Sequence, residues 1–350
     1  MPSLTPKLLN ELRFSQDDVA TLRALGECLG KQKLYIKQKL DTLESLQTQA
    51  AIESADASNR LEGITAPGDR IEALVKDSAN PLNRSEQEIA GYRDVMELIH
   101  QTGPDMPITA AVILQLHQWL YKYMPEAGGH WKTTDNEIVE KDTDGNVTRV
   151  RFKALSAVET PQAMQDLVDN YKQALADGRD AMVIIPLFIL DFLCIHPYRD
   201  GNGRISRLLT GLLLYHAGYQ VGRYISLERR FFETSKTYYE VLETSSQGWH
   251  ESRHDAMPWV RYFWGVMLSA YQEFEDRVGN IEEGRGSKTK RIRNAVERKV
   301  MPFRMADLKK ELPDVSRDMI RLVLRTMKEE GQIRTEGRGP AARWIPVENN

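Results

Sequence analysis

The 350-residue sequence contains only two cysteines, Cys28 and Cys194. Two cysteines cannot form a disulfide framework, and the apolar surroundings of Cys194 predict a buried thiol. No group of histidines and cysteines has the spacing of a zinc site. His117, His250 and His254 are therefore expected to be structural or surface residues. This excludes disulfide-rich scaffolds and zinc-binding modules.

Targeting and membrane segments are also missing. The first residues, Met-Pro-Ser-Leu-Thr-Pro-Lys, lack the hydrophobic core of a signal peptide. An apolar run at 181–195 is too short to cross a bilayer and contains Asp191, so it is expected to be a core helix. We therefore expect a protein of the reducing cytoplasm with no membrane partner.

Strand-like alternation is scarce, whereas helical periodicity is found along most of the chain. Hydrophobic residues make up 41% of the sequence, which is enough for well-packed cores. No internal repeat is present. The length of 350 residues favours two or three domains, and the expected fold class is mainly all-α.

One stretch carries most of the chemical information. Residues 196–207 read His-Pro-Tyr-Arg-Asp-Gly-Asn-Gly-Arg-Ile-Ser-Arg, between apolar-rich segments at 181–195 and 205–216. This arrangement predicts two buried helices joined by a phosphate-binding loop. An ordinary helix–helix turn is the alternative for a lone Gly-Asn-Gly, but the additional charged residues at fixed offsets favour a functional site.

Each part of this stretch suits chemistry on a nucleoside triphosphate. An imidazole ordinarily titrates near neutrality, so His196 is a candidate to take a proton from a hydroxyl. Asp200 offers hard oxygens to Mg²⁺. Gly201-Asn202-Gly203 lets several backbone N–H groups point at one anion. Arg204 and Arg207 are three residues apart, so they share a face in the first helical turn, where the helix dipole also favours phosphate.

The stretch resembles the signature of the Fic family, His-Pro-Phe-x-Asp/Glu-Gly-Asn-Gly-Arg-x-x-Arg, and departs from it only at Tyr198, which keeps an aromatic ring. The resemblance covers most of residues 50–275. It implies transfer of AMP from ATP to a hydroxyl side chain of a target protein. By position the resemblance implies that His196 is the general base and that Asp200 is the Mg²⁺ ligand. It also implies that the α- and β-phosphates are held by Gly201, Asn202, Gly203 and Arg204. The γ-phosphate would be held by Arg207.

A second motif lies upstream, at Ser58-Asn59-Arg60-Leu61-Glu62-Gly63. Ser58 and Glu62 are four residues apart and share a helix face, and Gly63 is a candidate for the residue that ends the helix. By itself this is an ordinary helix end. The motif resembles the Fic inhibitory motif, Ser/Thr-x-x-x-Glu-Gly/Asn, on the N-terminal side of the core. It implies that a helix at about 50–63 presents Glu62 to Arg207 and blocks the productive pose of the γ-phosphate.

Residues 129–152 predict a β-hairpin with its turn at Asp144-Gly145. The family resemblance implies that this hairpin is a flap that covers the nucleotide and docks the target as an added strand. A purely structural hairpin is the alternative.

Tyr238 and Tyr239 lie on a predicted helix. The family often has a tyrosine pair near the adenine, although aromatic residues at helical spacing also suit a core. The Asn and Asp that family members often carry further on are replaced by Ser246, Gln247 and Gly248, which leaves the sugar and base contacts open.

The C-terminal part differs in charge. Residues 286–350 carry 16 Lys and Arg against 9 Asp and Glu, a net charge of +7, whereas the first 285 residues carry 31 against 41, a net charge of −10. A polar linker at 282–287 precedes it. The elements expected beyond the linker are helices at 289–300, 303–312 and Ser316 to about Glu330, then strands at 333–336 and 343–347. This order is that of a winged helix-turn-helix, and it resembles the small C-terminal domain of many bacterial Fic proteins. The charge favours DNA, although such domains also bind proteins or form dimers.

Three regions are therefore expected. They are an N-terminal helical region at 1–110 with the inhibitory helix, a Fic core at 111–280 with the flap, and a winged-helix domain at 286–350. The implied activity is protein adenylylation on Ser, Thr or Tyr with ATP and Mg²⁺. The target is another protein or the chain itself, and a homodimer is a further expectation. Removal of AMP, transfer of another phosphate-containing group, and a DNA-bound regulator that senses ATP are the alternatives. The intact base His196 argues against the last of these.

Overall fold

A computed structural model describes residues 2–38, 40–141, 146–279, 287–297, 299, 303–337 and 343–346. The chain divides into two units, Met1–Phe274 and Glu275–Asn350. The division falls within helix α12, Met257–Gly279, whereas the border expected from the sequence lies between residues 280 and 286. Most of the linker expected at 282–287 lies outside the described residues.

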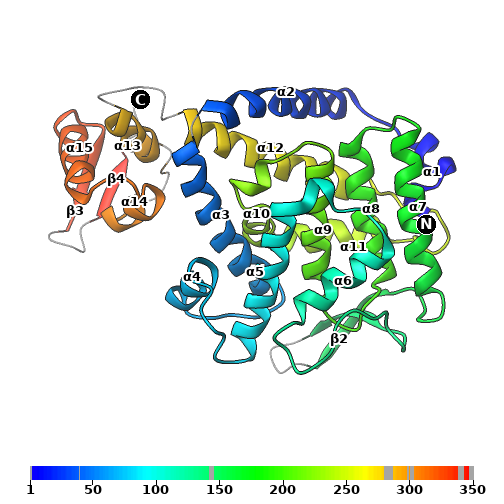
Figure 1. Cartoon of the computed structure of the whole chain (residues 1–350). Coiled ribbons are helices and arrows are strands. Elements are labelled where there is room, and N and C mark those ends of the chain that lie inside the picture. The colour runs from blue at the N-terminus through cyan, green and yellow to red at the C-terminus, as the bar shows by residue number, and fades with distance from the viewer. Residues whose placement is uncertain are drawn as a thin grey trace. The chain divides into compact units, whose positions relative to one another are not determined.

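The first unit is mainly helical, as the scarcity of strand patterns predicts (Figure 1). Its helices are η1 (Pro2–Leu4), α1 (Pro6–Glu11), α2 (Gln16–Gln38), α3 (Leu40–Arg60), α4 (Gly68–Lys76), α5 (Arg84–Thr102), η2 (Gly103–Asp105), α6 (Ala110–Leu120), α7 (Thr160–Ala176), α8 (Ala181–Ile195), α9 (Asn202–His216), η3 (Val221–Arg223), α10 (Leu227–Glu233), α11 (Ser235–Ser246) and α12. Its strands are β1 (Glu137–Lys141) and β2 (Val147–Lys153).

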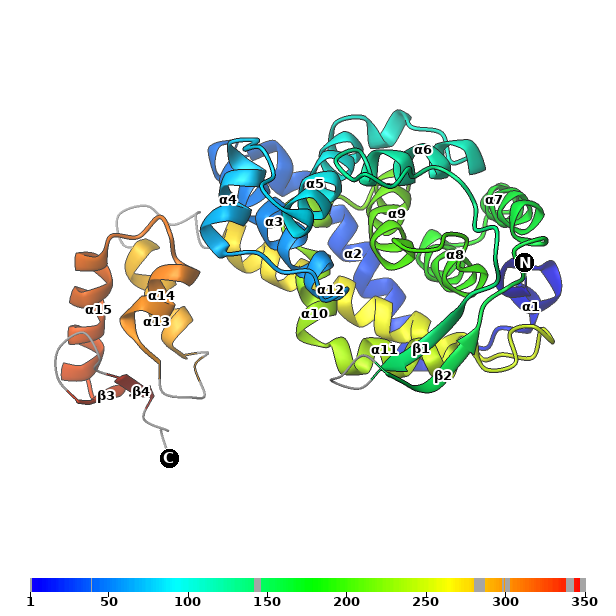
Figure 2. The same cartoon turned by 90° about the horizontal axis from the view of Figure 1, so that it is seen from below.

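Helix α8 is almost fully buried and packs between α7 and α9 (Figure 2). It has the bounds expected from its apolar run, and nearly all of its side chains are buried, including that of Cys194. The indole N–H groups of Trp259 and Trp264 donate to its backbone carbonyls at 2.8 and 2.7 Å. Large aromatic side chains from α12 thus fix the position of α8 in the core, since a buried indole N–H needs an acceptor.

The local sequence explains where α8 begins and ends. Asp180 precedes it and accepts a hydrogen bond from the N–H of Met182 at 2.7 Å, as an N-cap residue does. The helix ends because His196 adopts the left-handed conformation, with φ 50° and ψ 62°. Residue 196 therefore leaves the helix axis at the point where the motif begins.

The hairpin is shorter than the sequence predicts. Strands β1 and β2 are antiparallel, with Ile138 opposite Phe152 and a bulge before Val139. Residues 129–136 are not strand, which corrects the expected start at 129, because this segment hydrogen-bonds to α6 and to the end of α8 instead. The expected turn at Asp144-Gly145 lies outside the described residues. The hairpin packs against α11 (Figure 2).

The second unit contains three helices followed by an antiparallel pair of strands. These are α13 (Ser287–Glu297), α14 (Met305–Glu311), α15 (Arg317–Glu329), β3 (Ile333–Glu336) and β4 (Arg343–Pro346). As expected, Ser316 caps α15 by accepting from the N–H of Met319 at 3.2 Å, and Gly331 follows with φ 75°. The unit has its own core, made of Ile292, Ala295, Val296, Phe303, Leu308, Leu312, Val315, Ile320, Val323, Leu324, Met327 and Ile333.

Among the described helices of both units, none has the combination of length and apolar character that a membrane span requires.

Candidate functional site

The motif forms the connection between α8 and α9. Gly201, with φ 84°, precedes the first residue of α9. The side chain of Asn202 closes the loop, because it accepts from the N–H of Tyr198 at 2.9 Å and donates to the carbonyl of Tyr198 at 2.8 Å. The first N–H groups of a helix have no acceptor within the helix. The loop and the start of α9 therefore present free backbone N–H groups, and anion binding there stays a prediction.

His117 supports this loop from α6. Its ring stacks on Tyr198 with centroids 3.7 Å apart. Nδ1 accepts from the N–H of Gly129 at 2.9 Å, so Nε2 carries the proton and donates to the carbonyl of Asp200 at 3.1 Å. Burial lowers the pKa of His117 to about 4, which keeps the ring neutral. His117 thus has the structural role that was expected, and the part of the molecule that it stabilises is the motif loop.

His196 is held in the form that a general base requires. Its Nδ1 lies 3.3 Å from the carbonyl oxygen of Leu193. A carbonyl can only accept, so Nδ1 carries the proton and Nε2 has the free lone pair. Burial lowers the pKa of His196 to about 4. At neutral pH the ring is therefore an uncharged proton acceptor.

Asp200 and Arg204 differ in exposure. The side chain of Asp200 is 65% exposed and accepts from the hydroxyl of Tyr121 at 2.9 Å. Burial works to raise the pKa of Asp200, but the charge of Arg204 and the Tyr121 hydroxyl hold it below its usual value. Arg204 is 1% exposed and pairs with Glu88 of α5 at 2.6 Å. Asp200, which also lies 3.5 Å from Nη2 of Arg204, thus offers an exposed and ionised carboxylate to a ligand, whereas the guanidinium of Arg204 is buried and paired.

Arg207 is buried and bound to the end of α3. Its Nε donates to Ser58 Oγ at 2.8 Å, and its Nη2 donates to the Ser58 carbonyl at 2.8 Å and to Glu62 Oε1 at 2.7 Å. Burial disfavours the charge, yet the carboxylate of Glu62 raises the pKa of Arg207 above its usual value. The structure therefore brings together the two motifs that the sequence places 145 residues apart.

Glu62 also lies over the start of α9. A Cβ atom added to Gly203 would collide with Glu62 Oε1. The helix itself ends at Arg60, earlier than the expected residue 63, and Gly63 has φ 77°. The turn after Arg60 carries the carboxylate onto the first turn of α9. The carboxylate of Glu62 thus occupies the position where this helix N-terminus would bind an anion.

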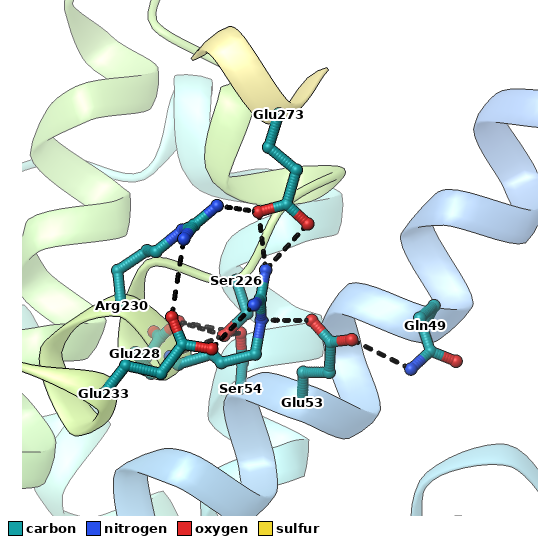
Figure 3. A network of polar contacts seen from close by, with 9 residues as sticks. Gln49, Glu53, Ser54, Ser226, Glu228, Arg230, Glu233 and Glu273 are labelled. Carbon is teal, nitrogen blue, oxygen red and sulfur yellow. Dashed lines mark hydrogen bonds and ion pairs between the residues drawn. The ribbon is translucent and has the colours of Figure 1, made fainter. Parts of the chain in front are cut away.

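A polar network fixes α3 on the core independently of Glu62 (Figure 3). Glu53 pairs with Arg229 of α10 at 2.9 Å, and Ser54 Oγ donates to Glu228 at 2.7 Å. Arg229 also pairs with Glu273 of α12 at 2.6 Å. Several charges that share partners hold one geometry better than an isolated surface pair does. We infer that these contacts hold the helix that carries Ser58 and leads into the turn with Glu62.

The tyrosine pair flanks this contact. Tyr238 is buried and packs against Phe231 and Trp259, as the core alternative for the pair implies. Tyr239 donates from its hydroxyl to the carbonyl of Leu61 at 3.0 Å. Tyr239 therefore binds the segment between Ser58 and Glu62, and contact of either ring with adenine stays a prediction.

Sequence reasoning did not find several neighbours of the motif. Glu88, Tyr121, Lys132 and Asn136 all bond to residues 195–204 from 60 to 116 positions away. No local pattern marks these residues, because a single glutamate or asparagine in a helix or loop carries no spacing signal.

The fold and the loop together define a helical protein in which a loop joins a neutral histidine to a helix N-terminus. Residues 107–214 match the model of the Fic/DOC family. The structure resembles that of a Fic family protein from Desulfovibrio desulfuricans G20, with a TM-score of 0.63 and 20% identity over 97% of this chain and 98% of that chain.

Two curated relatives match over shorter stretches. The protein adenylyltransferase Fic of Culex quinquefasciatus is 32% identical over 111 residues, which is 26% of this chain and 20% of the relative. The ribonucleoside-diphosphate reductase small chain of Ostreid herpesvirus 1 (isolate France) is 36% identical over 78 residues, 20% of this chain and 13% of the relative. The chain thus spans a fifth or less of the length of these relatives.

Proposed function

We propose that this protein is a protein adenylyltransferase that moves AMP from ATP to a Ser, Thr or Tyr hydroxyl of a target protein or of the chain itself. The observation that carries the proposal is the neutral His196, whose Nε2 is free to accept a proton beside the N-terminus of α9. A proton acceptor next to a phosphate-binding helix end is the arrangement that phosphoryl-type transfer to a hydroxyl requires. The Culex relative supports the choice of AMP.

The triphosphate would be held by the start of α9. The backbone N–H groups of Asn202, Gly203 and Arg204 would bind the α- and β-phosphates, since the Arg204 guanidinium is occupied by Glu88. Arg207 would bind the γ-phosphate after release from Glu62. Because Gly203 has no Cβ, an anion can approach its backbone as closely as the Glu62 carboxylate does in this structure.

The site is compatible with Mg²⁺. Asp200 is ionised and exposed, but no group of three His, Cys, Asp or Glu side chains among the described residues could hold a metal ion. Mg²⁺ in nucleotide sites commonly has one or two carboxylate ligands and takes the others from phosphates and water. Bound through Asp200, it would neutralise phosphate charge.

The reaction follows from this arrangement. The target hydroxyl oxygen forms a bond to the α-phosphorus, while Nε2 of His196 takes its proton. The bond from the α-phosphorus to the oxygen that bridges the α- and β-phosphates breaks, and pyrophosphate leaves with that oxygen. The products are protein-bound AMP and pyrophosphate.

Labelled ATP tests the proposal. With the Glu62→Gly variant and a cell extract as the source of targets, α-labelled ATP should label protein and γ-labelled ATP should not. Labelling from the γ-position alone would identify a kinase-like transfer instead. Labelling from neither position would contradict nucleotidyl transfer.

For the second unit we propose DNA binding. Arg317, Arg321 and Arg325 lie four residues apart along α15, and all three are exposed, so they form a basic stripe on one face of the helix. A stripe of this kind suits phosphate contacts along a DNA duplex.

Salt should weaken this DNA binding steeply. With three phosphate contacts, affinity for a DNA duplex should fall about 40-fold between 50 and 200 mM salt, because counterions are released on binding. Arg317→Gln with Arg325→Gln should lower the slope of log affinity against log salt by about 2, and the exposed Arg23→Gln should leave it unchanged. Fluorescence anisotropy measures both. Salt-independent binding, or none, would favour a protein-binding or dimerising role.

A further inference from the structure

The base of the hairpin is hydrogen-bonded to the turn that carries His196. The consecutive carbonyls of residues 194–198 all accept bonds from residues that flank the two strands. The donors are Leu155 N to Cys194 at 3.3 Å, Lys132 Nζ to Ile195 at 2.9 Å, Asn136 Nδ2 to His196 at 3.4 Å, Lys132 N to Pro197 at 2.8 Å and Asn136 Nδ2 to Tyr198 at 2.9 Å. Two side chains, those of Lys132 and Asn136, account for three of these bonds.

These bonds supply donors to the carbonyls at and after the end of α8, and the carbonyl of Tyr198 also accepts from Asn202 at 2.8 Å. The last carbonyls of α8 have no partner within the helix, and His196 holds a left-handed conformation that is unfavourable for a residue with a side chain. Such a conformation persists only where its surroundings enforce it. Lys132 and Asn136 supply bonds on both sides of the His196 Cα, to the carbonyls of residues 195, 196 and 198.

The two side chains also orient each other. Lys132 is 5% exposed, and its Nζ donates to Asn136 Oδ1 at 2.8 Å. This bond turns the amide so that Nδ2 faces the carbonyls of the turn. Burial lowers the pKa of Lys132 to about 8, so the ammonium group remains largely charged at neutral pH. A charged donor makes the stronger bond to a carbonyl.

We propose that Lys132 and Asn136 are positioning residues, which hold His196 so that its Nε2 faces the target hydroxyl and which join this histidine to the hairpin. The inference rests on the proposed role of His196 as the base. It means that the hairpin and the base form one unit, so a target segment bound to the hairpin is placed at a fixed distance from the proton acceptor.

Two variants test the inference, each with a matched control. Asn136→Asp keeps the shape and the acceptor for Lys132 but removes the N–H donors, and Lys132→Met keeps the length but removes the ammonium group. Asn170→Asp and Lys172→Met on α7 are the controls. All four changes are made in the Glu62→Gly background, and single-turnover transfer is measured at saturating ATP. The transfer rate should fall about 10- to 100-fold in Asn136→Asp and Lys132→Met and stay unchanged in the two controls. The reason is that a small misplacement of a reacting group lowers the rate by about this factor.

ATP affinity separates positioning from general damage. It should change less than about twofold in both variants, because Asn202 and Tyr198 close the phosphate loop with bonds of their own. Lys132→Arg, which keeps a charged donor, should recover most of the rate lost in Lys132→Met. A loss of ATP affinity in parallel with the rate, or no rescue by arginine, would overturn the inference.

A spectroscopic readout keeps the two proposals distinguishable. The imidazole ¹⁵N resonances of His196 report its tautomer, which should be Nδ1–H in the wild type and mixed in Asn136→Asp. If no form of the protein transfers AMP, the proposed function fails, and the resonances still decide whether these residues position His196. Resonances that stay as in the wild type would reject the positioning role.

Discussion

Replacement of His196 by alanine is expected to lower AMP transfer by about 10²- to 10⁴-fold, which is the usual contribution of a general base. ATP affinity should stay close to that of the parent protein, because the phosphate loop is closed by Asn202 and Tyr198 and contains no bond from the imidazole. Single-turnover labelling and titration calorimetry with ATP measure the two quantities separately.

The matched control for this variant is His216→Ala, at the exposed end of α9. It should transfer at the parental rate. Substantial transfer by His196→Ala, with the fold and ATP affinity intact, would remove the histidine from the role of base. The proton acceptor would then have to be sought among the carboxylates, of which Asp200 and Glu62 are at the site.

The pH dependence should follow from the same environment. Burial lowers the pKa of His196 to about 4, from an ordinary value of 6.5, so its neutral form persists through neutral and mildly acidic pH. The kcat/KM of the free enzyme should therefore show no loss from this group between pH 8 and 6, and should fall only as the pH approaches 4. A loss centred near pH 6.5 would contradict a buried base.

The free energy of unfolding should depend on pH between about pH 4 and 6.5, the folded and ordinary pKa values of His196. The pKa of His117 is also lowered by burial to about 4, and an unfolded histidine binds its proton near pH 6.5. These two groups thus contribute stability that is fully present above pH 6.5 and is lost as the pH falls toward 4. In urea denaturation between pH 6.5 and 4, His196→Ala should reduce the pH dependence of the unfolding free energy by about one proton.

The parts of the site that were predictable from the sequence are the local ones. The apolar run that ends at Ile195, the positive φ of Gly201 and the helix that follows all depend on residues close together in the chain. The same holds for Ser316 at the start of α15. Short-range steric rules decide such features, so spacing and residue type are enough.

The parts that were not predictable depend on contacts between distant residues. The pairing of the Arg204 side chain with Glu88, 116 positions away, is one such contact, and phosphate binding by residue 204 stays a prediction. The Glu53–Arg229 contact that holds α3 spans 176 positions. The predicted start of the hairpin at residue 129 is too early, because residues 129–136 hydrogen-bond to α6, to the end of α8 and to the loop after it. The sequence of the hairpin does not indicate these distant partners.

Glu62→Gly is expected to raise AMP transfer, including self-modification, about 30- to 1000-fold. The reason is the charge-assisted contact between Glu62 and Arg207, 2.7 Å apart, which occupies the group that the γ-phosphate needs. A partly buried contact of this kind is worth on the order of 2–4 kcal/mol, which corresponds to that range of rates. The side chain of Glu62 is 33% exposed, which favours the lower part of the range.

The substitution should change stability little. The substituted position lies beyond the end of α3 at Arg60, so the new glycine would not interrupt the helix, and α3 keeps its bonds to α10 through Glu53 and Ser54. Arg207 keeps both bonds to Ser58. Thermal denaturation should therefore show a melting temperature close to the parental one, and Glu72→Gly on the exposed face of α4 is the matched control for transfer.

The same variant distinguishes addition of AMP from its removal. If Glu62 positions a water for hydrolysis, as the alternative reading holds, then Glu62→Gly should lose the release of AMP from a pre-adenylylated target while it gains transfer. If Glu62 only inhibits, release should be absent from both proteins and transfer alone should rise. Incubation of each protein with a target labelled by Glu62→Gly, followed by measurement of free AMP, decides between the two. Transfer no faster than in the wild type, with ATP saturating and the fold intact, would reduce the Ser58–Gly63 segment to an ordinary helix end whose carboxylate lies on the site without controlling it.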